Sequence, residues 1–407
     1  HQGDKMELLN KMSEADSLIA GYRKTRQASG WKSSTQQYGL NLLKETCAMQ
    51  KELREGTWEE KLGKPFKYNE RGHTRYIRPM LPKETVMQHS LCENVLLPIL
   101  RPCLIHDNGA SLKGKGISFT RRRLEQHLRQ HYRQHGIEGY ILMMDFSKYF
   151  DNLPHEGLLK AFAGKIPDPD IISLIAKLLK PYEVDVSYSD DPNIEKQLHN
   201  AIKHAEIDKS LLTGRRMMRK SMGIGASISQ IAGIYYPTPM DTWCKTVMGC
   251  KHYGAYMDDR YCIHKSKEFL KQLLEGIKAI AESLGIFINE KKTQIVKLSH
   301  GFTWLKTRYS ITKTGKIIRH IPHDVIVRQR RKMKKLALFV LEGKLAFESF
   351  RKQYKDWRGD KDRYHAHRTL RNMDNLYRRL QKWITKKGPI LLKSLGRTAP
   401  SRLKDCP

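Results

Sequence analysis

The chain has 407 residues, 75 of them Lys or Arg and 42 of them Asp or Glu, which gives a formal net charge of +33. So large a positive charge excludes most enzymes that act on small metabolites, and it indicates a polyanionic partner. Because 39% of the residues are hydrophobic, the chain is too apolar to be a disordered basic tail. Its length predicts about two or three folded domains.

The sequence contains no apolar run long enough to span a membrane and no apolar core typical of a secretion signal. We therefore expect an intracellular protein without membrane contact. The seven cysteines are scattered and include no CxxC pair, which argues against a disulfide framework and against a zinc ribbon. Reduced thiols, most of them buried, are the expectation.

The N-terminal part is predicted to form helices followed by a hairpin. Apolar residues recur at helical spacing over residues 5–61, which predicts a helical segment within 1–64. After it, Phe66-Lys67-Tyr68 and Arg75-Tyr76-Ile77-Arg78 alternate around a polar tip, as is typical of a β-hairpin. Since this hairpin carries several cations, we expect it to contact an anion.

Two helices are predicted next, over residues 84–97 and 119–134, and the second carries five arginines. The Gly- and Lys-rich stretch 108–116 between them lacks the GxxxxGK[ST] pattern of a phosphate-binding loop. The continuous apolar run Tyr140–Met144 predicts a buried strand, and this run ends on Asp145. A carboxylate at the end of a buried strand is costly unless it binds something.

Further along, residues 223–230 are predicted to open a helix whose small first residues would let a nucleotide or another chain approach the backbone. Strands are predicted over 251–256 and 260–263, on either side of Met257-Asp258-Asp259. This arrangement places two adjacent carboxylates at a hairpin tip. Another strand is predicted to begin within 284–289.

Asp145 and the pair Asp258–Asp259 lie on different predicted strands of a strongly basic chain, and metal binding is the most economical explanation for them. Mg²⁺ is typically held by one or two carboxylates together with substrate phosphates. Two such ions, about 4 Å apart, can activate an attacking 3′-hydroxyl and stabilise a pyrophosphate leaving group. The carboxylates therefore indicate nucleotidyl transfer with two Mg²⁺ ions as cofactors. The tetrapeptide Tyr256-Met257-Asp258-Asp259 alone would be weak support.

Together with its neighbours, this tetrapeptide resembles the reverse transcriptase family, in particular its bacterial branch of group II intron, retron, diversity-generating and defence-associated enzymes. The resemblance covers about 75–305. It rests on an ordered set of motifs: Asp145-Phe146-Ser147-Lys148-Tyr149-Phe150-Asp151 with His155, Gly225-x-x-x-Ser229-Gln230, Tyr256-Met257-Asp258-Asp259, Asn289-Glu290-Lys291-Lys292-Thr293 and the primer grip Phe302-Thr303-Trp304-Leu305-Lys306.

The resemblance implies an α+β fold of the right-hand polymerase type, with fingers, a palm built from an antiparallel sheet and helices, and a helical thumb. It also implies a location in the bacterial cytoplasm. The expected parts are an N-terminal helical extension (1–64), fingers (65–139), a palm (140–310) with a surface insertion at about 181–215, and a basic helical thumb (311–407).

Roles for individual residues follow from the resemblance as well. Asp145, Asp258 and Asp259 would bind the two Mg²⁺ ions together with the Phe146 carbonyl. Lys292 would be the general acid that protonates pyrophosphate. The remaining implied contacts are with the incoming dNTP, from Arg75, Lys67, Arg78, Phe150, Ile224, Gly225 and Gln230, and with primer and template, from Trp304, Leu305, Lys306, Arg330, Arg331, Lys334 and Lys335.

Three of these residues bear on product and fidelity. Phe150 falls at the family's steric-gate position, where an aromatic ring excludes a ribonucleotide 2′-hydroxyl, which favours DNA as the product. Many relatives carry Gln before the motif glycine and Pro after its serine, where this chain has Ile224 and Gln230, as diversity-generating and defence-associated enzymes do. Because an aliphatic side chain cannot make the hydrogen bonds of an amide, reduced fidelity is a hypothesis.

The C-terminal part is predicted to bind nucleic acid without contributing chemistry. Residues 328–335 carry six cations in eight positions, a density that would follow a duplex backbone and give a steep salt dependence. The aromatic residues Trp357, Tyr364, Tyr377 and Trp383 are expected in the core of the helical bundle rather than as platforms for bases.

The leading hypothesis is an RNA-directed DNA polymerase that copies a dedicated structured RNA into cDNA, in a bacterial or prophage anti-phage defence system. An error-prone enzyme of a diversity-generating retroelement is the closest alternative. An RNA-templated RNA polymerase is disfavoured by Phe150, and a non-catalytic RNA-binding scaffold by the three carboxylates. Expected partners are the structured RNA template, the cDNA product and dNTPs, with an accessory protein or a second copy of the chain as further candidates.

Overall fold

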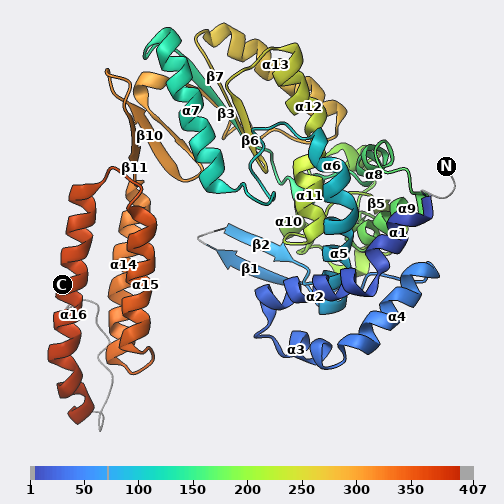
Figure 1. Cartoon of the computed structure of the whole chain (residues 1–407), viewed down its shortest axis with the longest axis horizontal. Coiled ribbons are helices and arrows are strands. Elements are labelled where there is room, and N and C mark those ends of the chain that lie inside the picture. Colours follow the sequence, from blue (N-terminus) through green and yellow to red (C-terminus); the bar gives the residue numbers. More distant parts are fainter. Residues whose placement is uncertain (1–4, 71–72, 395–407) are drawn as a thin grey trace. The chain divides into compact units, whose positions relative to one another are not determined.

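The computed structural model describes residues 5–70 and 73–394 and has a mixed α+β fold, as predicted (Figure 1). The chain forms two compact units: His1–His127 with Ile141–Ile295, and Leu128–Tyr140 with Val296–Pro407. The four predicted parts stay a prediction, and both the start of the N-terminal part and the end of the thumb lie outside the described residues.

The first unit begins with helices, as predicted. These are α1 (Lys5–Ser13), α2 (Ala15–Ser29), α3 (Ser33–Leu40) and α4 (Leu42–Arg54). Helix α2 lies along α5 (Pro82–Leu91), and the side chains of Leu18, Met49 and Val86 are buried in this region. The N-terminal segment is therefore part of the folded first unit.

The predicted hairpin is present as β1 (Phe66–Glu70) and β2 (His73–Ile77), paired antiparallel with Lys67 opposite Tyr76 and Tyr68 opposite Arg75. Side chains on a strand alternate between its two faces, and directly opposed residues share a face. Lys67 and Tyr76 therefore lie on one face of the hairpin, and Arg75 lies on the other.

The first unit is completed by further helices. They are η1 (Cys92–Leu96), α6 (Leu97–Leu100), η2 (Arg101–Cys103), η3 (Phe150–Asn152), α8 (His155–Ala163), α9 (Pro169–Leu179), η4 (Lys180–Tyr182), α11 (Ser227–Tyr235), α12 (Thr238–Thr242), η7 (Trp243–Val247) and α13 (Lys267–Ser283). The arginine-rich helix α7 (Ile117–His135) contributes residues to both units.

A four-stranded sheet has the order β6-β7-β3-β8. Its strands are β3 (Tyr140–Met144), β6 (Tyr253–Tyr256), β7 (Asp259–His264) and β8 (Gln294–Lys297). The buried strand β3 and the hairpin of β6 with β7 confirm the predictions, and β6 pairs antiparallel with β7.

The prediction of a strand that begins within 284–289 was wrong in position, because the strand begins later in the chain. Only an isolated bridge joins Phe146 to Ile288, and the strand begins at Gln294. The reason is a turn in between, where the amides of Lys292 and Thr293 donate to the Asn289 carbonyl at 3.1 and 2.9 Å. These backbone groups are therefore used in the turn and not in a strand ladder.

Segment 181–215, predicted as a surface insertion, is partly buried. It contains β4 (Val184–Asp185), η5 (Ile194–Lys196), α10 (Ala201–His204) and η6 (Lys209–Leu211), and β4 pairs with β5 (Met217–Met218). Val184, Val186 and Met218 form a small core there. The segment also contacts the hairpin, because Lys67 pairs with Glu206 at 3.3 Å and Arg78 donates to the Pro181 carbonyl.

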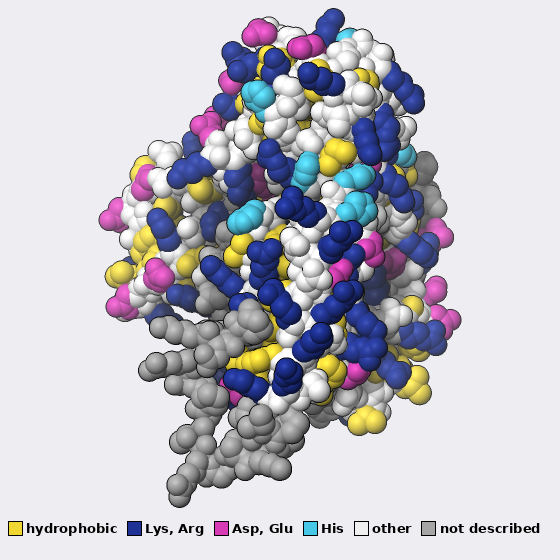
Figure 2. Space-filling model, turned by 90° about the vertical axis from the view of Figure 1, so that its left-hand side faces the viewer, with side chains coloured by type: hydrophobic (Ala, Val, Ile, Leu, Met, Phe, Trp, Pro, Cys, Tyr) yellow, Lys and Arg dark blue, Asp and Glu magenta, His cyan; other side chains and the backbone are white. Residues whose placement is uncertain are grey.

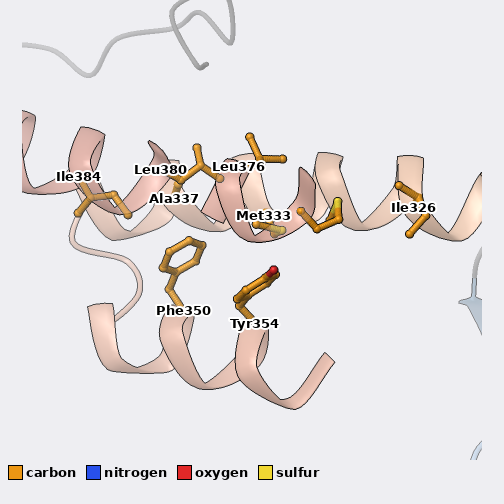
Figure 3. Packing of buried hydrophobic residues seen from close by; sticks show 9 residues of the cluster. Ile326, Met333, Ala337, Phe350, Tyr354, Leu376, Leu380 and Ile384 are labelled. Atoms are coloured by element: carbon orange, nitrogen blue, oxygen red, sulfur yellow. The ribbon is translucent and has the colours of Figure 1, made fainter. Parts of the chain in front are cut away.

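The second unit contains a three-stranded antiparallel sheet of order β11-β10-β9 and a helical bundle. The elements are β9 (Phe302–Trp304), β10 (Thr307–Ile311), β11 (Ile317–His320), α14 (His323–Leu341), α15 (Phe347–Lys361) and α16 (His367–Ser394). Figure 3 shows Phe350 and Tyr354 of α15 facing side chains of α14 and α16. Trp357, Tyr377 and Trp383 pack against this core, as predicted.

Among the described residues, no helix combines the length and the hydrophobicity that a membrane crossing needs. The cysteines within the described ranges are free thiols, and Cys92, Cys244, Cys250 and Cys262 are buried while Cys47 is exposed.

Candidate active site

The three predicted carboxylates lie at the ends of neighbouring strands. Asp145 directly follows β3, and β7, which lies beside β3 in the sheet, begins at Asp259 (Figure 1). Tyr256 pairs with Asp259, so Met257 and Asp258 form a two-residue turn between β6 and β7. Met257 has φ 56°, a left-handed conformation that is uncommon for a residue with a side chain.

Negative charge is concentrated at this point. Asp145 is only 6% exposed, and its carboxylate interacts electrostatically with that of Asp258. Burial and the charge of Asp145 raise the pKa of Asp258 to about 6. Burial, Asp258 and Asp145 raise the pKa of Asp259 to about 7. Because each carboxylate disfavours the ionised form of the next, a cation at this point would be stabilised.

The donor set fits a divalent metal ion of the Mg²⁺ type. No group of three or more His, Cys, Asp or Glu side chains within the described residues is arranged to hold a metal ion by itself. Mg²⁺ usually binds through one or two carboxylates and takes its other ligands from water and substrate phosphates. The close pair Asp145–Asp258 supplies hard oxygen ligands of that kind and number.

Lys292 lies at the same place, as the motif suggested. Its Nζ is 2.7 Å from Asp145 Oδ2, and the Asn289 amide donates to the same oxygen at 3.3 Å. The hydrogen bond to Asp145 raises the pKa of Lys292. Since 67% of the Lys292 side chain is exposed, a protonated amine is available both to Asp145 and to a ligand.

A buried ion pair beneath the Met257–Asp258 turn was not predicted. Arg260 is 0% and Asp241 2% exposed at the side chain, and Arg260 Nε lies 3.2 Å from Asp241 Oδ1. The Tyr253 hydroxyl donates to the same carboxylate at 2.6 Å. Arg260 also donates to the Met257 carbonyl. The guanidinium therefore ties the turn to the interior of the unit.

Arg260 also contacts Phe146, which follows strand β3 and Asp145. Its guanidinium lies 4.8 Å from the centre of the Phe146 ring, in a cation–π arrangement. Phe146 follows Asp145 and is 2% exposed. The available sequence signal was an arginine among the apolar residues of the strand predicted over 260–263, since a charge that becomes buried needs a partner.

Phe150 and the Met257–Asp258 turn both lie close to Gly233 of helix α11. The Tyr149 hydroxyl donates to the Gly233 carbonyl of α11 at 2.8 Å. A Cβ at Gly233 would lie 2.9 Å from Met257 Sδ and 3.1 Å from Phe150 Cε1. The absence of a side chain at Gly233 is therefore what lets α11 approach both Phe150 and the turn.

The residues before α11 form a tight entry to that helix. Gly225 has φ 91°, which a residue with a side chain rarely adopts, and Ile224 is half-buried beside it. The Ser227 hydroxyl lies 3.0 Å from His89 Nδ1 of α5. Gln230 is exposed, and its Oε1 accepts a hydrogen bond from the Ser111 hydroxyl at 3.4 Å.

The three hairpin cations are not brought together. Arg75 is exposed on one face of the hairpin, opposite Tyr68. Lys67 pairs with Glu206 and Arg78 with Pro181, so both contact segment 181–215. A shared role of the three in binding one triphosphate stays a prediction.

The predicted primer-grip residues belong to the second unit. Leu305 (φ 44°) and Lys306 (φ 59°) form a two-residue turn between β9 and β10, and Trp304 at the end of β9 is 4% exposed. Two consecutive left-handed residues are typical of the turns that match strand twist, where Asn and Gly are usual. Lys306 is exposed at the tip.

The basic residues of α14 lie on its exposed side. Met333 and Ala337 are buried in the bundle core, whereas Arg330, Arg331 and Lys335 are exposed. Arg330 and Lys334 line a groove of about 640 Å³ whose other residues, Asn372, Asn375, Leu376 and Arg379, come from α16. Figure 2 shows that Lys and Arg predominate over Asp and Glu on the face it presents. Such a surface favours a nucleic-acid backbone.

A family model described as reverse transcriptase (RNA-dependent DNA polymerase) matches residues 87–313. No protein with a curated description matches the chain.

Solved structures that match include telomerase from Candida albicans in complex with a TWJ fragment of telomeric RNA, at 14% identity and TM-score 0.42, with 82% of this chain and 55% of that chain covered. Another is apo telomerase from Candida tropicalis truncated from its C-terminal domain, at 12% identity and TM-score 0.44, with 66% and 58% covered. The chain thus spans somewhat more than half the length of these telomerase chains.

Proposed function

The chain belongs to the reverse transcriptase (RNA-dependent DNA polymerase) family, and on that premise we propose that it copies an RNA template into DNA at the site of Asp145, Asp258 and Asp259. The observation that carries the proposal is that Asp145, Asp258 and Asp259 interact at the ends of neighbouring strands, with the Lys292 amine 2.7 Å from Asp145. Acidic ligands beside one exposed cation suit a reaction that releases pyrophosphate.

Within this proposal, Asp145, Asp258, Asp259 and the Phe146 carbonyl would hold two Mg²⁺ ions. When bound, these ions would lower the pKa of the primer 3′-hydroxyl and neutralise charge on the phosphates. Lys292 would leave Asp145 and donate a proton to the departing pyrophosphate, because its amine is protonated and exposed.

Other residues of the first unit would select the nucleotide. Phe150 would exclude the ribonucleotide 2′-hydroxyl, and it is held in place by the close approach of α11 at Gly233. Gly225, Ile224 and Gln230 would line the entry to α11 along the incoming dNTP. Arg75, exposed on its hairpin, would contact the triphosphate.

In the second unit, Trp304, Leu305 and Lys306 would contact the primer end. The cations of α14 would follow the backbone of the template–primer duplex; they are the exposed Arg330, Arg331 and Lys335 and the half-buried Lys334. These contacts are with phosphates, so they position the duplex and do not read its sequence.

The proposed biological role is copying of one dedicated structured RNA in a bacterial or prophage anti-phage defence system, in the bacterial cytoplasm. Ile224 supports a second candidate, the error-prone enzyme of a diversity-generating retroelement, because an aliphatic side chain beside the nucleotide offers no hydrogen bond to check the base.

A primer-extension assay tests the activity. The purified chain receives an RNA or a DNA template of the same sequence, with a DNA primer, Mg²⁺, and either dNTPs or rNTPs. We expect full-length product on RNA with dNTPs and much less with rNTPs. Product with rNTPs alone would favour an RNA polymerase, and no product with any combination would favour an RNA-binding scaffold.

Sequencing of the RNA that co-purifies with the protein, and of the cDNA made on it, tests the role. Faithful copying of one short noncoding RNA supports defence. Errors concentrated at template adenines, which decrease in an Ile224→Gln variant, would point instead to diversification. An unselective mixture of cellular RNAs would contradict a dedicated template.

A further inference from the structure

A buried carboxylate outside the candidate active site, Asp107, lies on the loop that leads from η2 to α7 in the first unit. It is 4% exposed. Arg123 Nε of α7 lies 2.5 Å from Asp107 Oδ1, and Lys245 Nζ of η7 lies 2.8 Å from Asp107 Oδ2. His127 Nε2 of α7 is 3.6 Å from the same oxygen as Lys245. One carboxylate therefore joins the loop to two helices that are far apart in the sequence.

Asp107 is ionised and is bound firmly to its cations. Burial acts to raise its pKa, but hydrogen bonds from Arg123 and Lys245 outweigh burial and lower the pKa of Asp107 to about 2. Hydrogen bonds between charged groups are roughly twice as strong as those between neutral groups. A buried carboxylate with two such bonds has no equally favourable position elsewhere in the interior, so the start of the loop is fixed.

The backbone of the loop is bonded to β6 close to the carboxylate site. The Ala255 amide donates to the Asp107 carbonyl, and the Gly109 amide donates to the Ala255 carbonyl, both at 3.1 Å. Asn108 thereby forms a parallel bridge with Ala255. Ala255 lies two residues before the Met257–Asp258 turn. The bonds that fix Asp107 therefore also fix the end of the strand from which this turn starts.

Side chains of the same loop contact the turn itself. Ala110 and Leu112 are buried in a small cluster with Ile234 of α11. Tyr256 and Met257 pack against this cluster. Met257 has the left-handed φ of 56°, and a residue with a side chain keeps such a conformation only where its surroundings impose it. The loop contacts supply part of those surroundings.

We propose that Asp107 is a positioning residue for DNA synthesis. Its two ion pairs fix loop 107–112, and this loop fixes the turn that carries Asp258. The inference rests on the proposed function, in which Asp258 binds metal, and it assigns a task to residues that the two-metal reaction itself does not use. Asp107 would act only through the loop, because its carboxylate is occupied by its own cations. The turn matters for the rate because displacement of a reacting group by about 1 Å can cost about 100-fold.

Single-turnover incorporation of one dNTP on an RNA template tests the effect on the rate. Asp107→Asn keeps the size of the side chain and removes the charge that binds both cations. We expect the maximal rate per active site to fall roughly 10- to 100-fold, with unchanged affinity for the template–primer duplex in filter binding. Asp107→Glu keeps the charge and should recover part of the rate.

Hydrogen exchange provides a readout that does not depend on activity. The backbone amides of residues 253–260 are followed in the full chain, without Mg²⁺ and without nucleic acid. We expect them to exchange faster in Asp107→Asn than in the wild type, because the turn loses a support and opens locally more often. A merely structural role would instead speed exchange throughout the first unit.

Two control variants separate positioning from stability. Glu52→Gln neutralises another carboxylate of the first unit, whose two oxygens lie 2.7 and 2.8 Å from Lys83 Nζ. Ile175→Val removes one methylene from a fully buried side chain of α9 and should lower the melting temperature. We expect both controls to keep the wild-type rate and the wild-type exchange over residues 253–260.

Lys245→Met changes the same ion pairs from the other side. Because Arg123 still binds Asp107 in this variant, we expect the same changes in rate and exchange to a smaller extent. The double variant with Asp107→Asn should be no slower than Asp107→Asn alone, since both substitutions break one interaction. If Asp107→Asn does not fold, Lys245→Met alone decides.

The proposal is overturned if Asp107→Asn keeps the wild-type rate per active site, or if exchange over residues 253–260 does not change. It also fails if Ile175→Val, at a similar melting temperature, loses as much rate as Asp107→Asn. The two proposals fail in different ways. If the wild type makes no DNA, the proposed function fails, while hydrogen exchange still shows whether Asp107 holds the turn.

Discussion

Arg260→Met is the substitution whose effect follows most directly from the structure. It removes the positive member of a pair in which both side chains are at most 2% exposed. Asp241 would keep the Tyr253 hydroxyl at 2.6 Å but would be left as a buried charge without a cation. Removal of one partner from a buried ion pair costs about 3–5 kcal/mol, so we expect a loss of that size in the free energy of unfolding.

A double-mutant cycle isolates the pair. Asp241→Leu alone should also destabilise, because it strands the Arg260 charge. The double variant with Arg260→Met and Asp241→Leu leaves no buried charge, so we expect it to be more stable than Arg260→Met alone. Urea unfolding of the first unit, followed by circular dichroism, measures all four proteins.

The same substitution should affect catalysis through the turn. Arg260→Met removes the donor to the Met257 carbonyl, and Met257 is held in a left-handed conformation. We expect a higher Mg²⁺ concentration for half-maximal DNA synthesis, which Arg260→Lys restores only in part. The reasoning fails if Arg260→Met costs less than about 1 kcal/mol, well below the buried-pair range, or if the double variant loses the sum of both single effects.

Further outcomes concern selectivity, affinity and pH. Phe150→Ala should raise ribonucleotide use relative to dNTP use by about 10- to 200-fold in single-nucleotide incorporation, and an unchanged ratio would exclude a gate at this position. Joint substitution of Arg330 and Lys334 by Gln should lower the slope of log affinity against log salt for an RNA–DNA duplex by about 0.9 for each phosphate that is no longer neutralised; an unchanged slope would place the duplex elsewhere. Burial and Glu84 raise the pKa of Glu60 to about 8. In the unfolded chain this carboxyl has the ordinary glutamate pKa of about 4, so between about pH 4 and pH 8 only the folded chain binds the proton. The contribution of protonated Glu60 to the free energy of unfolding is therefore lost as the pH rises from about 4 to about 8. Urea midpoints measured between pH 6 and pH 9 should fall in the wild type and stay level in Glu60→Gln.

The carboxylate site was accessible to sequence reasoning because its signals are local. Asp145 follows an apolar run, and Asp258 lies in a tetrapeptide between two strand patterns, so each could be located from its neighbours alone. The roles of Phe150, Ile224 and Gly225 were predicted from the family resemblance. The structure adds that Phe150 lies beside Gly233 and that the Tyr182 hydroxyl packs on Gly223, just before Ile224.

The parts that sequence reasoning missed depend on contacts between distant segments. The pairing of Arg260 with Asp241 joins a strand to a helix, and the contact of Lys67 with Glu206 joins the hairpin to segment 181–215. The spacing of apolar residues along the sequence does not reveal which distant side chains form such ion pairs. The misplaced strand within 284–289 had an apolar pattern, but the following turn at Asn289 takes up its backbone hydrogen bonds.

DNA synthesis on an RNA template as a function of Mg²⁺ concentration, in the wild type and in Asp145→Asn and Asp258→Asn, tests the central claim most directly. Asp170→Asn, which changes an exposed carboxylate of α9, is the matched control. We predict that both site variants fold and make no product at any Mg²⁺ concentration. Asp258→Asn should have a melting temperature at or above that of the wild type because one of two neighbouring like charges is gone. Product from either variant at wild-type levels would contradict the assignment of these two carboxylates as the metal-binding pair.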